Sequence, residues 1–168
     1  MGKLKRFSIL AILLISGTFC FANQISFQIV QHDDTIDSVS EDSMIIEDSV
    51  LNNFFDYGYI VTNSDAAISE SASQDEKLYK IGQNDAFNGY SDFFVQIKLY
   101  YERTEDTVSK NADLYKIEFS ITSVKSGKKI AAKTIKDIKI DRTKKNNLAQ
   151  VSSDLVNEIS KALKAYKA

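Results

Sequence analysis

The chain has 168 residues, of which 21 are Lys or Arg and 23 are Asp or Glu, so its formal net charge at pH 7 is −2. An acidic chain without a basic motif is unlike a nucleic-acid-binding protein, which excludes that class. A single cysteine excludes a disulfide-stapled fold, and a chain of this length can form one hydrophobic core.

The amino-terminal segment has the pattern of a signal peptide. Lys3, Lys5 and Arg6 precede an apolar run over 7–22 that carries no charge and is too short to be a comfortable membrane-spanning helix. Cleavage after Ala22 would make Asn23 the new terminus. The sequence therefore predicts a signal peptide over 1–22 and a single α/β domain over 23–168, exported to the periplasm or secreted.

Cys20 offers an alternative processing route. A cysteine just after an apolar run can be the lipid-carrying first residue of a bacterial lipoprotein, which would place the protein at the outer membrane. Phe19 disfavours this route, because the lipoprotein peptidase prefers a small residue before the cysteine. If the cut follows Ala22 instead, the mature chain has no cysteine, and we expect neither disulfides nor thiolate chemistry.

The first half of the domain predicts a strand, a helix and a second strand. ISFQIVQ (25–31) alternates apolar and polar residues, which is typical of a strand with one buried face. The spacing of Ser38 and Glu41 fits a helix start, and Gly58 fits the left-handed end of that helix. The predicted apolar stripe of this helix consists of Met44, Ile46, Val50, Leu51, Phe54 and Phe55. Residues 59–62 form the second strand, which we expect to be parallel to the first.

A Ser- and Ala-rich stretch follows the second strand. Residues 64–74 show weak periodicity and predict a mobile surface loop. A second helix is expected from Asp75, with a face of small residues that includes Gly82, Ala86 and Gly89 and that could pack closely on a sheet.

The second half predicts three strands and a terminal helix. Alternating patterns over 92–103, 113–124 and 128–140, with Ser126-Gly127 at the last turn, indicate an antiparallel meander with one wet face. Five apolar residues spaced by three or four then indicate an amphipathic helix over 146–166: Leu148, Val151, Leu155, Ile159 and Leu163. We therefore predict an α+β fold in which this helix packs on one face of a mixed sheet.

This order of elements resembles a group of bacterial envelope domains. DYGYIVTN has a helix that ends at glycine and leads straight into a strand, SVKSGKKIA has a glycine in the last hairpin, and VSSDLVNEISKAL closes the domain. In these features the chain is similar to the amino-terminal domain of TolB, to the curli secretion lipoprotein CsgG and to LpoB-type activators of penicillin-binding proteins. The resemblance implies a periplasmic accessory domain that binds another protein.

Few residues suggest chemistry. His32, the only histidine, stands before two aspartates and could offer metal or acid–base groups, but a lone histidine in such a position is usually solvated in a loop. No nucleophile, phosphate-binding or dinucleotide motif is present in the sequence. We therefore expect no enzyme activity, no catalytic residue, no cofactor and no metal. Tyr57 and Tyr100 are the candidate exposed contacts for a partner.

Three functional hypotheses remain open. The first is a non-catalytic envelope accessory protein whose partner acts in cell-wall synthesis, secretion or envelope assembly. The alternative is a small exported enzyme or ligand carrier with a pocket between the terminal helix and the sheet. Self-association through the exposed edge of the meander is the third. A membrane contact is expected only if Cys20 is lipidated.

Overall fold

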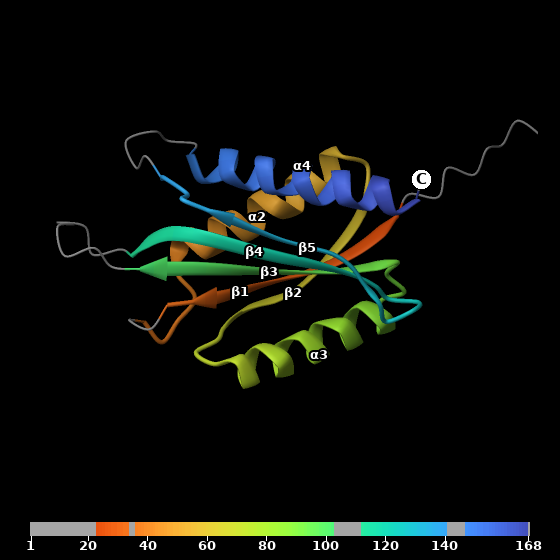
Figure 1. Cartoon of the computed structure of the whole chain (residues 1–168), viewed down its shortest axis with the longest axis horizontal. Helices are drawn as coiled ribbons and strands as arrows, with labels where there is room; N and C mark the ends of the chain where they lie inside the picture. Colours follow the sequence, from red (N-terminus) through yellow and green to blue (C-terminus); the bar gives the residue numbers. More distant parts are fainter. Residues whose placement is uncertain (1–22, 34–35, 103–111, 141–146, 168) are drawn as a thin grey trace, which may run out of the picture.

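The computed structural model describes residues 23–33, 36–102, 112–140 and 147–167. Within these residues, one five-stranded mixed sheet is packed with three helices, which confirms the predicted α+β class (Figure 1). The elements in chain order are β1 (Gln24–His32), α2 (Glu41–Asp56), β2 (Ile60–Ile68), α3 (Ala72–Asn88), β3 (Phe93–Glu102), β4 (Asp113–Ser123), β5 (Lys129–Lys136) and α4 (Asn147–Lys167).

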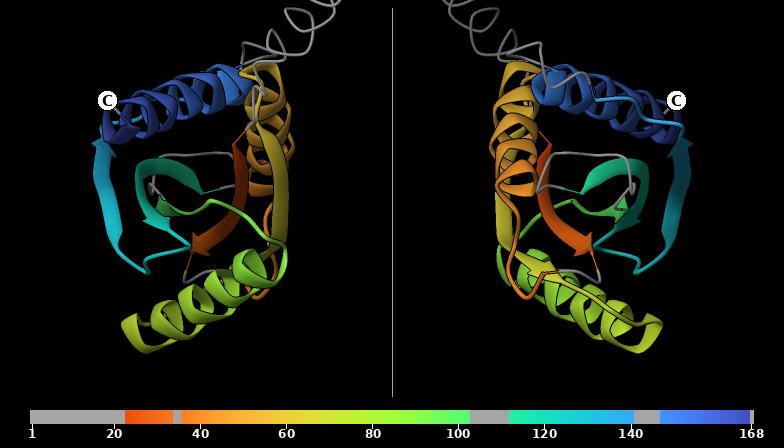
Figure 2. Two further views of the ribbon diagram at one scale, coloured as in Figure 1. Left: turned by 90° about the vertical axis from the view of Figure 1, so that its right-hand side faces the viewer. Right: turned by 90° about the vertical axis from the view of Figure 1, so that its left-hand side faces the viewer.

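The sheet has the strand order β2-β1-β3-β4-β5. β1 pairs in parallel with β2 and with β3, whereas β3, β4 and β5 pair in antiparallel fashion. The predicted crossover and the predicted order of the meander are both confirmed. The predicted wet face of the meander is wrong for the first part of β3, because Phe94 and Gln96 on that face are buried. Viewed from its ends, the molecule has α2 and α4 on one face of the sheet and α3 on the other (Figure 2).

The corner between α2 and β2 forms at the predicted glycine. Gly58 has a φ of 81°, in the left-handed region that favours glycine, and it follows the C-cap residue Tyr57. The start of α2 differs from the prediction. The N-cap is Ser40, whose hydroxyl accepts a hydrogen bond of 3.2 Å from the amide of Ser43, and not Ser38.

The predicted apolar stripe of α2 is too broad. Ile46, Val50 and Phe54 are buried, whereas the side chains of Met44 and Phe55 are 48% and 63% exposed. The sheet contacts only a narrow strip of the helix, so residues one position away from that strip turn towards solvent.

The predicted loop over 64–74 is wrong for most of its length. Strand β2 continues to Ile68, and Ser71 already caps α3, so the connection consists of residues 69–71. β2 lies at the edge of the sheet and pairs only with β1. Polar residues such as Asn63 and Asp65 are therefore exposed on it, which weakens the apolar pattern from which a strand is predicted.

β1 has two buried faces, whereas one wet face was predicted. Ser26 and Gln28 are 3% and 2% exposed because α3 covers them. The close approach occurs at Gly82, where an added Cβ atom would lie 2.5 Å from Cζ of Phe94 on β3. The prediction that the small-residue face of this helix packs closely on the sheet is confirmed.

The core lies between the sheet and the α2–α4 pair. α4 contributes Leu155, Ile159 and Leu163, all fully or almost fully buried, as the spacing of its apolar residues predicted. The described core begins at Ile25, so a chain that starts at Asn23 contains all of it. The predicted segment 1–22 lies outside the described residues, and none of the described helices is long and apolar enough to cross a membrane.

Candidate functional site

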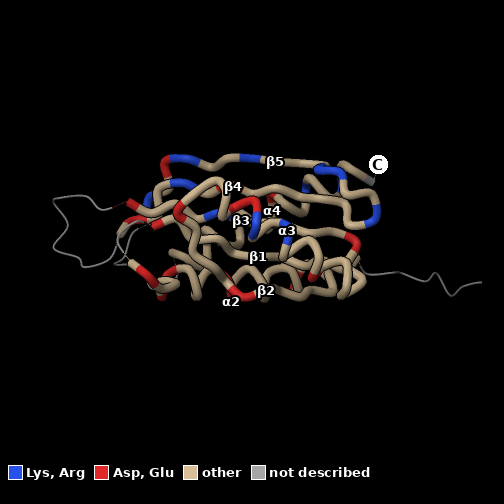
Figure 3. The backbone as a smooth tube through the Cα atoms, turned by 90° about the horizontal axis from the view of Figure 1, so that it is seen from below, with Lys and Arg blue, Asp and Glu red and all other residues tan. Residues whose placement is uncertain are grey.

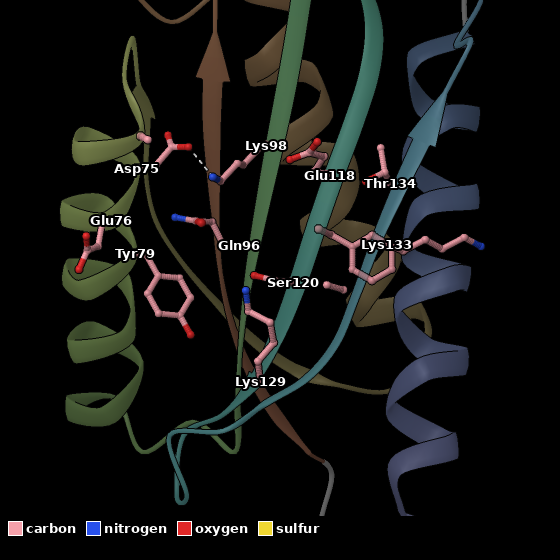
Figure 4. Close-up of a pocket in the computed structure, with 13 residues that line it drawn as sticks. Asp75, Glu76, Tyr79, Gln96, Lys98, Glu118, Ser120, Lys129, Lys133 and Thr134 are labelled. Carbon is pink, nitrogen blue, oxygen red and sulfur yellow. Dashed lines mark hydrogen bonds and ion pairs between the residues drawn. The ribbon is translucent and has the colours of Figure 1, made fainter.

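The candidate site is the part of the α3 face that α3 leaves uncovered. The helix crosses β1 and β3, while the same face of β4 and β5 stays open (Figure 4). Strand register aligns side chains of this face in rows. Lys98 of β3 stands opposite Glu118 of β4, which stands opposite Thr134 of β5. In the next row, Gln96, Ser120 and Ala132 are aligned in the same way.

A groove of about 560 Å³ runs between α3 and this open face. A second hollow of about 580 Å³ adjoins it, because Glu118 and Thr134 line both. The side chains that line the first hollow and are labelled in Figure 4 are Asp75, Glu76, Tyr79, Gln96, Lys98, Glu118, Ser120, Lys129, Lys133 and Thr134. Together the hollows follow the length of β5.

Asp75 from the first turn of α3 fixes one side of the groove. One carboxylate oxygen accepts a hydrogen bond from Nζ of Lys98. The same contact is a salt bridge between the two side chains. The other oxygen, Oδ1, lies 3.2 Å from Nε2 of His32, yet neither of these two buried atoms forms a hydrogen bond within the described chain. The two atoms are the exceptions in an otherwise bonded network, where buried polar atoms normally have partners.

Tyr100 connects His32 to the next carboxylate. Its ring stacks on the imidazole at a centroid distance of 4.3 Å, and its hydroxyl donates a 2.9 Å hydrogen bond to Glu118. Nζ of Lys116 lies 3.5 Å from the centroid of the same ring and donates a 3.1 Å hydrogen bond to Glu118. These contacts hold the groove side of the sheet in one arrangement before any ligand binds.

Burial and the neighbouring charges set the protonation states. Burial lowers the pKa of His32, and this outweighs the opposite influence of Asp75. Burial alone would raise the pKa of Asp75, but the hydrogen bond from Lys98 is the largest of the influences that reverse the shift and lower this pKa. The imidazole is therefore neutral at pH 7 and the carboxylate is ionised.

The second half of the network is balanced in the same way. Burial acts to raise the pKa of Glu118, while the hydrogen bonds from Lys116 and Tyr100 dominate and lower it. Burial, followed by the hydrogen bond to Glu118, raises the pKa of Tyr100, which keeps the phenol protonated. The groove thus presents fixed charges of both signs.

The arrangement is suited to holding a polar ligand. Among the described residues, no group of three or more His, Cys, Asp or Glu side chains could hold a metal ion. The small side chains of Ser120 and Ala132 form the base of the groove, and charged side chains line its sides. The extended backbone of a bound peptide therefore has room to lie along the strands.

Of the residues singled out from the sequence, His32 and Tyr100 come together at the groove, whereas Tyr57 lies elsewhere. Tyr100 is half-buried, although an exposed side chain was predicted. His32 is wrongly predicted as a solvated loop residue, because it is the last residue of β1 and stacks under Tyr100. Tyr57 is 41% exposed at the end of α2, and Nζ of Lys164 lies 6.0 Å from its ring centroid. The groove is lined by residues of α3 and the sheet, so Tyr57 is not part of it. Cys20 and Ala22 lie outside the described residues, and Asn23 is the first described residue.

No sequence pattern predicted the charged residues of the groove. Asp75 looks like a solvated helix residue, and its contact with Lys98 depends on how α3 lies on the sheet. Lys98 and Glu118 do fall on the predicted wet face, and the hairpin register is the signal that could have paired them. The pocket expected between α4 and the sheet is not where this groove lies, since the apolar side of α4 is buried in the core.

A family model described as "Uncharacterised protein" matches residues 24–164. No curated protein matches the chain.

Several solved structures are similar to this chain. One is a dodecamer of a PelC variant from Paraburkholderia phytofirmans, with 13% identity over 84% of this chain and 88% of that chain and a TM-score of 0.46. Another is TolB from Acinetobacter baumannii, with 12% identity over 86% of this chain but 29% of that chain and a TM-score of 0.47. A third is lipoprotein GNA1162 from Neisseria meningitidis, with 11% identity, coverages of 83% and 99%, and a TM-score of 0.44.

TolB, one of the proteins in the sequence resemblance, is thus among the similar structures. The resemblance to CsgG and to LpoB-type proteins stays a prediction. At these identities and TM-scores, the likeness concerns the arrangement of helices and strands and assigns no function.

Proposed function

This chain belongs to the family described as "Uncharacterised protein", whose model matches residues 24–164. Because that description gives no activity, we propose a function from the geometry of the groove. The protein is a non-catalytic accessory protein of the bacterial envelope. It binds an extended segment of a partner protein in the groove between α3 and β5.

The observation that carries this proposal is the continuous groove along the open face of the meander. The two hollows share Glu118 and Thr134 and follow β5, which has eight residues. Eight strand residues extend over about 26 Å, which is the length of a short extended peptide. Most residues that line the first hollow are charged or polar, whereas pockets for small molecules are lined mainly by apolar side chains.

Charge gives the groove its selectivity. Asp75 and Glu118 carry negative charge, and hydrogen bonds hold their carboxylates in place. Lys98 and Lys129 carry positive charge and line the same groove. A segment that binds well should place acidic residues near the lysines and basic residues near the carboxylates. Such complementary charges discriminate between partners more than they add to affinity.

Export rests on the amino-terminal sequence. The basic residues at positions 3, 5 and 6 and the uncharged apolar run over 7–22 support entry into the secretion pathway. An exported accessory protein of this kind meets its partner in the envelope, as the sequence resemblance implies.

Crosslinking in the native envelope, followed by identification of the proteins that copurify, tests the proposal. Thr134→Arg fills the groove with a bulky cation at an exposed position of β5, and Asn52→Arg makes the same change at an exposed position of α2 as a matched control. We expect one defined partner with the parent chain and with Asn52→Arg, and its loss with Thr134→Arg. Recovery of the protein alone, or equal recovery of the partner with both variants, would contradict the proposal.

One observation favours the second candidate, a ligand carrier or small enzyme. Nε2 of His32 and Oδ1 of Asp75 are buried without hydrogen bonds, so a small polar molecule could satisfy them. Native mass spectrometry of protein purified from the envelope would then detect a bound small molecule, and Asp75→Asn would abolish that adduct. A spectrum of the bare chain in both proteins would eliminate this candidate.

A further inference from the structure

Exposed aromatic side chains gather at one end of the molecule. Five of the six aromatic residues that are exposed in the described chain lie there, and Ile60 adds a sixth apolar side chain. The aromatic residues are Phe55, Tyr57, Phe87, Tyr90 and Tyr166, with exposed fractions from 41% to 88%. Exposed aromatics concentrated in this way usually mark an interaction surface.

Strand register shows that these residues share one end. Gln24 pairs with Ile60, and Ile25 pairs with Phe93 at the start of β3. Side-chain Nε2 of Gln24 also donates a 2.7 Å hydrogen bond to the carbonyl of Gly89, which follows α3. Helices α2, α3 and α4 all end here, at the end of the molecule where the C-terminus is marked (Figure 1).

Tyr90 is the most exposed of the group, at 88%. Its φ of 57° lies in the left-handed region, which is unusual for a bulky aromatic residue. No burial of its ring compensates for that backbone conformation. Residues with strained backbone conformations cluster at functional sites such as ligand clamps.

Lysines accompany the aromatic residues. The turn between β4 and β5 exposes Lys125 and Lys128, and Nζ of Lys164 near the end of α4 lies 6.0 Å from the centroid of the Tyr57 ring. Figure 3 marks Lys and Arg positions in blue along the backbone at this end, where the C-terminus is marked. Two exposed carboxylates, Asp56 and Asp92, are also present at this end, and Asp92 accepts a hydrogen bond from the amide of Gln24.

We propose that this end, which we call the aromatic end (Phe55, Tyr57, Ile60, Phe87, Tyr90 and Tyr166), contacts a negatively charged lipid surface. Aromatic rings and lysines are the side chains that favour the boundary between lipid headgroups and acyl chains. The rings come from the ends of separate elements, so they spread over this end and do not line one pocket. That distribution suits a membrane surface better than a compact protein hot spot, which clusters in one well-packed site.

The position of the amino terminus points the same way. Asn23, the first described residue, lies at the aromatic end, because its carbonyl accepts the amide hydrogen of Ile60. Cys20 stands three residues before it. An acyl chain on Cys20, one of the two processing outcomes considered from the sequence, would hold the aromatic end within about 11 Å of a bilayer, since a residue spans at most about 3.6 Å.

Vesicle sedimentation of the chain 23–168 tests the proposal without any lipid anchor. Phosphatidylcholine vesicles are compared with vesicles that also contain phosphatidylglycerol. We expect binding only to the negatively charged vesicles, and at least a tenfold weaker affinity for the double variant Phe87→Ser, Tyr90→Ser. Lys125→Gln and Lys128→Gln should each weaken binding about fivefold, the effect of one lysine near a charged membrane.

The matched control removes two exposed side chains from the opposite end of the molecule. Met44 and Tyr115 are 48% and 37% exposed there, and the double variant Met44→Ser, Tyr115→Ser should bind vesicles like the parent. Thr134→Arg in the groove should also bind vesicles normally, which separates this proposal from the proposed function. Circular dichroism confirms that each variant is folded, and the lysine variants remain informative if the aromatic variant is not.

Three results would overturn the proposal. The first is that the parent chain does not sediment with charged vesicles, and the second is that the double variant Phe87→Ser, Tyr90→Ser binds them as tightly as the parent. The third is that the variants keep vesicle binding but lose a partner protein or a dimer in size measurements, which would assign the aromatic end to a protein surface.

Discussion

Gly82→Ala tests how closely α3 lies on the sheet, which decides how much of the sheet stays open. An added Cβ would stand 2.5 Å and 2.7 Å from two ring carbons of Phe94 and 3.2 Å from Oε1 of Gln28. Phe94 is fully buried, and its ring packs against that of Tyr79 at a centroid distance of 5.5 Å. The ring therefore cannot move aside without disturbing further contacts.

Two effects of opposite sign determine the result. Alanine is better than glycine within a helix by about 1 kcal/mol. Adding a methyl group to a closely packed site costs about 1–3 kcal/mol, and approaches as short as these belong to the upper part of that range. We expect Gly82→Ala to lower the free energy of unfolding by about 2 kcal/mol, measured by urea denaturation followed by circular dichroism.

Asn84→Ala is the matched control, because Asn84 is exposed two residues later in the same helix. It should be neutral or slightly stabilising, since only helix propensity changes. In a Phe94→Leu background, the smaller side chain should reduce the cost of Gly82→Ala. If Gly82→Ala instead stabilises the protein as Asn84→Ala does, α3 does not lie this close to the sheet and the described groove is wrong.

Three further predictions concern stability. Gly58→Ala should cost about 1 kcal/mol in the same denaturation experiment, from backbone strain alone, because φ is 81° and no atom lies within 4 Å of the added Cβ; an unchanged stability would contradict this. Ser40→Ala should cost about 1 kcal/mol by removing the N-cap of α2, and Ser40→Asp should restore most of it. Burial lowers the pKa of His32 below 6.5, so the unfolded chain binds this proton more readily. The free energy of unfolding should therefore fall as the pH falls from about 7 through this pKa window, and His32→Gln should flatten that slope; equal slopes in both proteins would refute the assignment.

Local patterns predicted the parts of the fold that depend on neighbouring residues. The corner at Gly58 follows from one glycine between a helical and a strand-like pattern, and the left-handed φ was correctly expected. The alternation in β3 and β4 is strong because one face of each lies against the core. In α4, the apolar spacing identified Leu155, Ile159 and Leu163, which are buried, but not Val156, which is also buried.

Two of the errors come from contacts made, or not made, between segments distant in sequence. Ser26 and Gln28 look like a wet face until α3 covers them. The part of β2 from Ser64 onwards looks like a loop because it lies on an edge strand with exposed polar residues.

The charged network of the groove also depends on contacts between segments distant in sequence. Asp75 is paired with Lys98 only because α3 crosses β3, and His32 is stacked on Tyr100 only because β1 and β3 are parallel neighbours. No spacing within one segment encodes these contacts. Sequence patterns therefore located the elements but not the charged network between them.

Site-specific photocrosslinking tests most directly whether the groove binds the partner. A photoreactive residue replaces Thr134 in the groove in one protein and Asn52 on the exposed side of α2 in another, and both are irradiated in the native envelope. We expect a crosslink from position 134 to one short segment of a single partner, and none to that segment from position 52. Crosslinks to the same partner from position 52 alone would contradict binding in the groove.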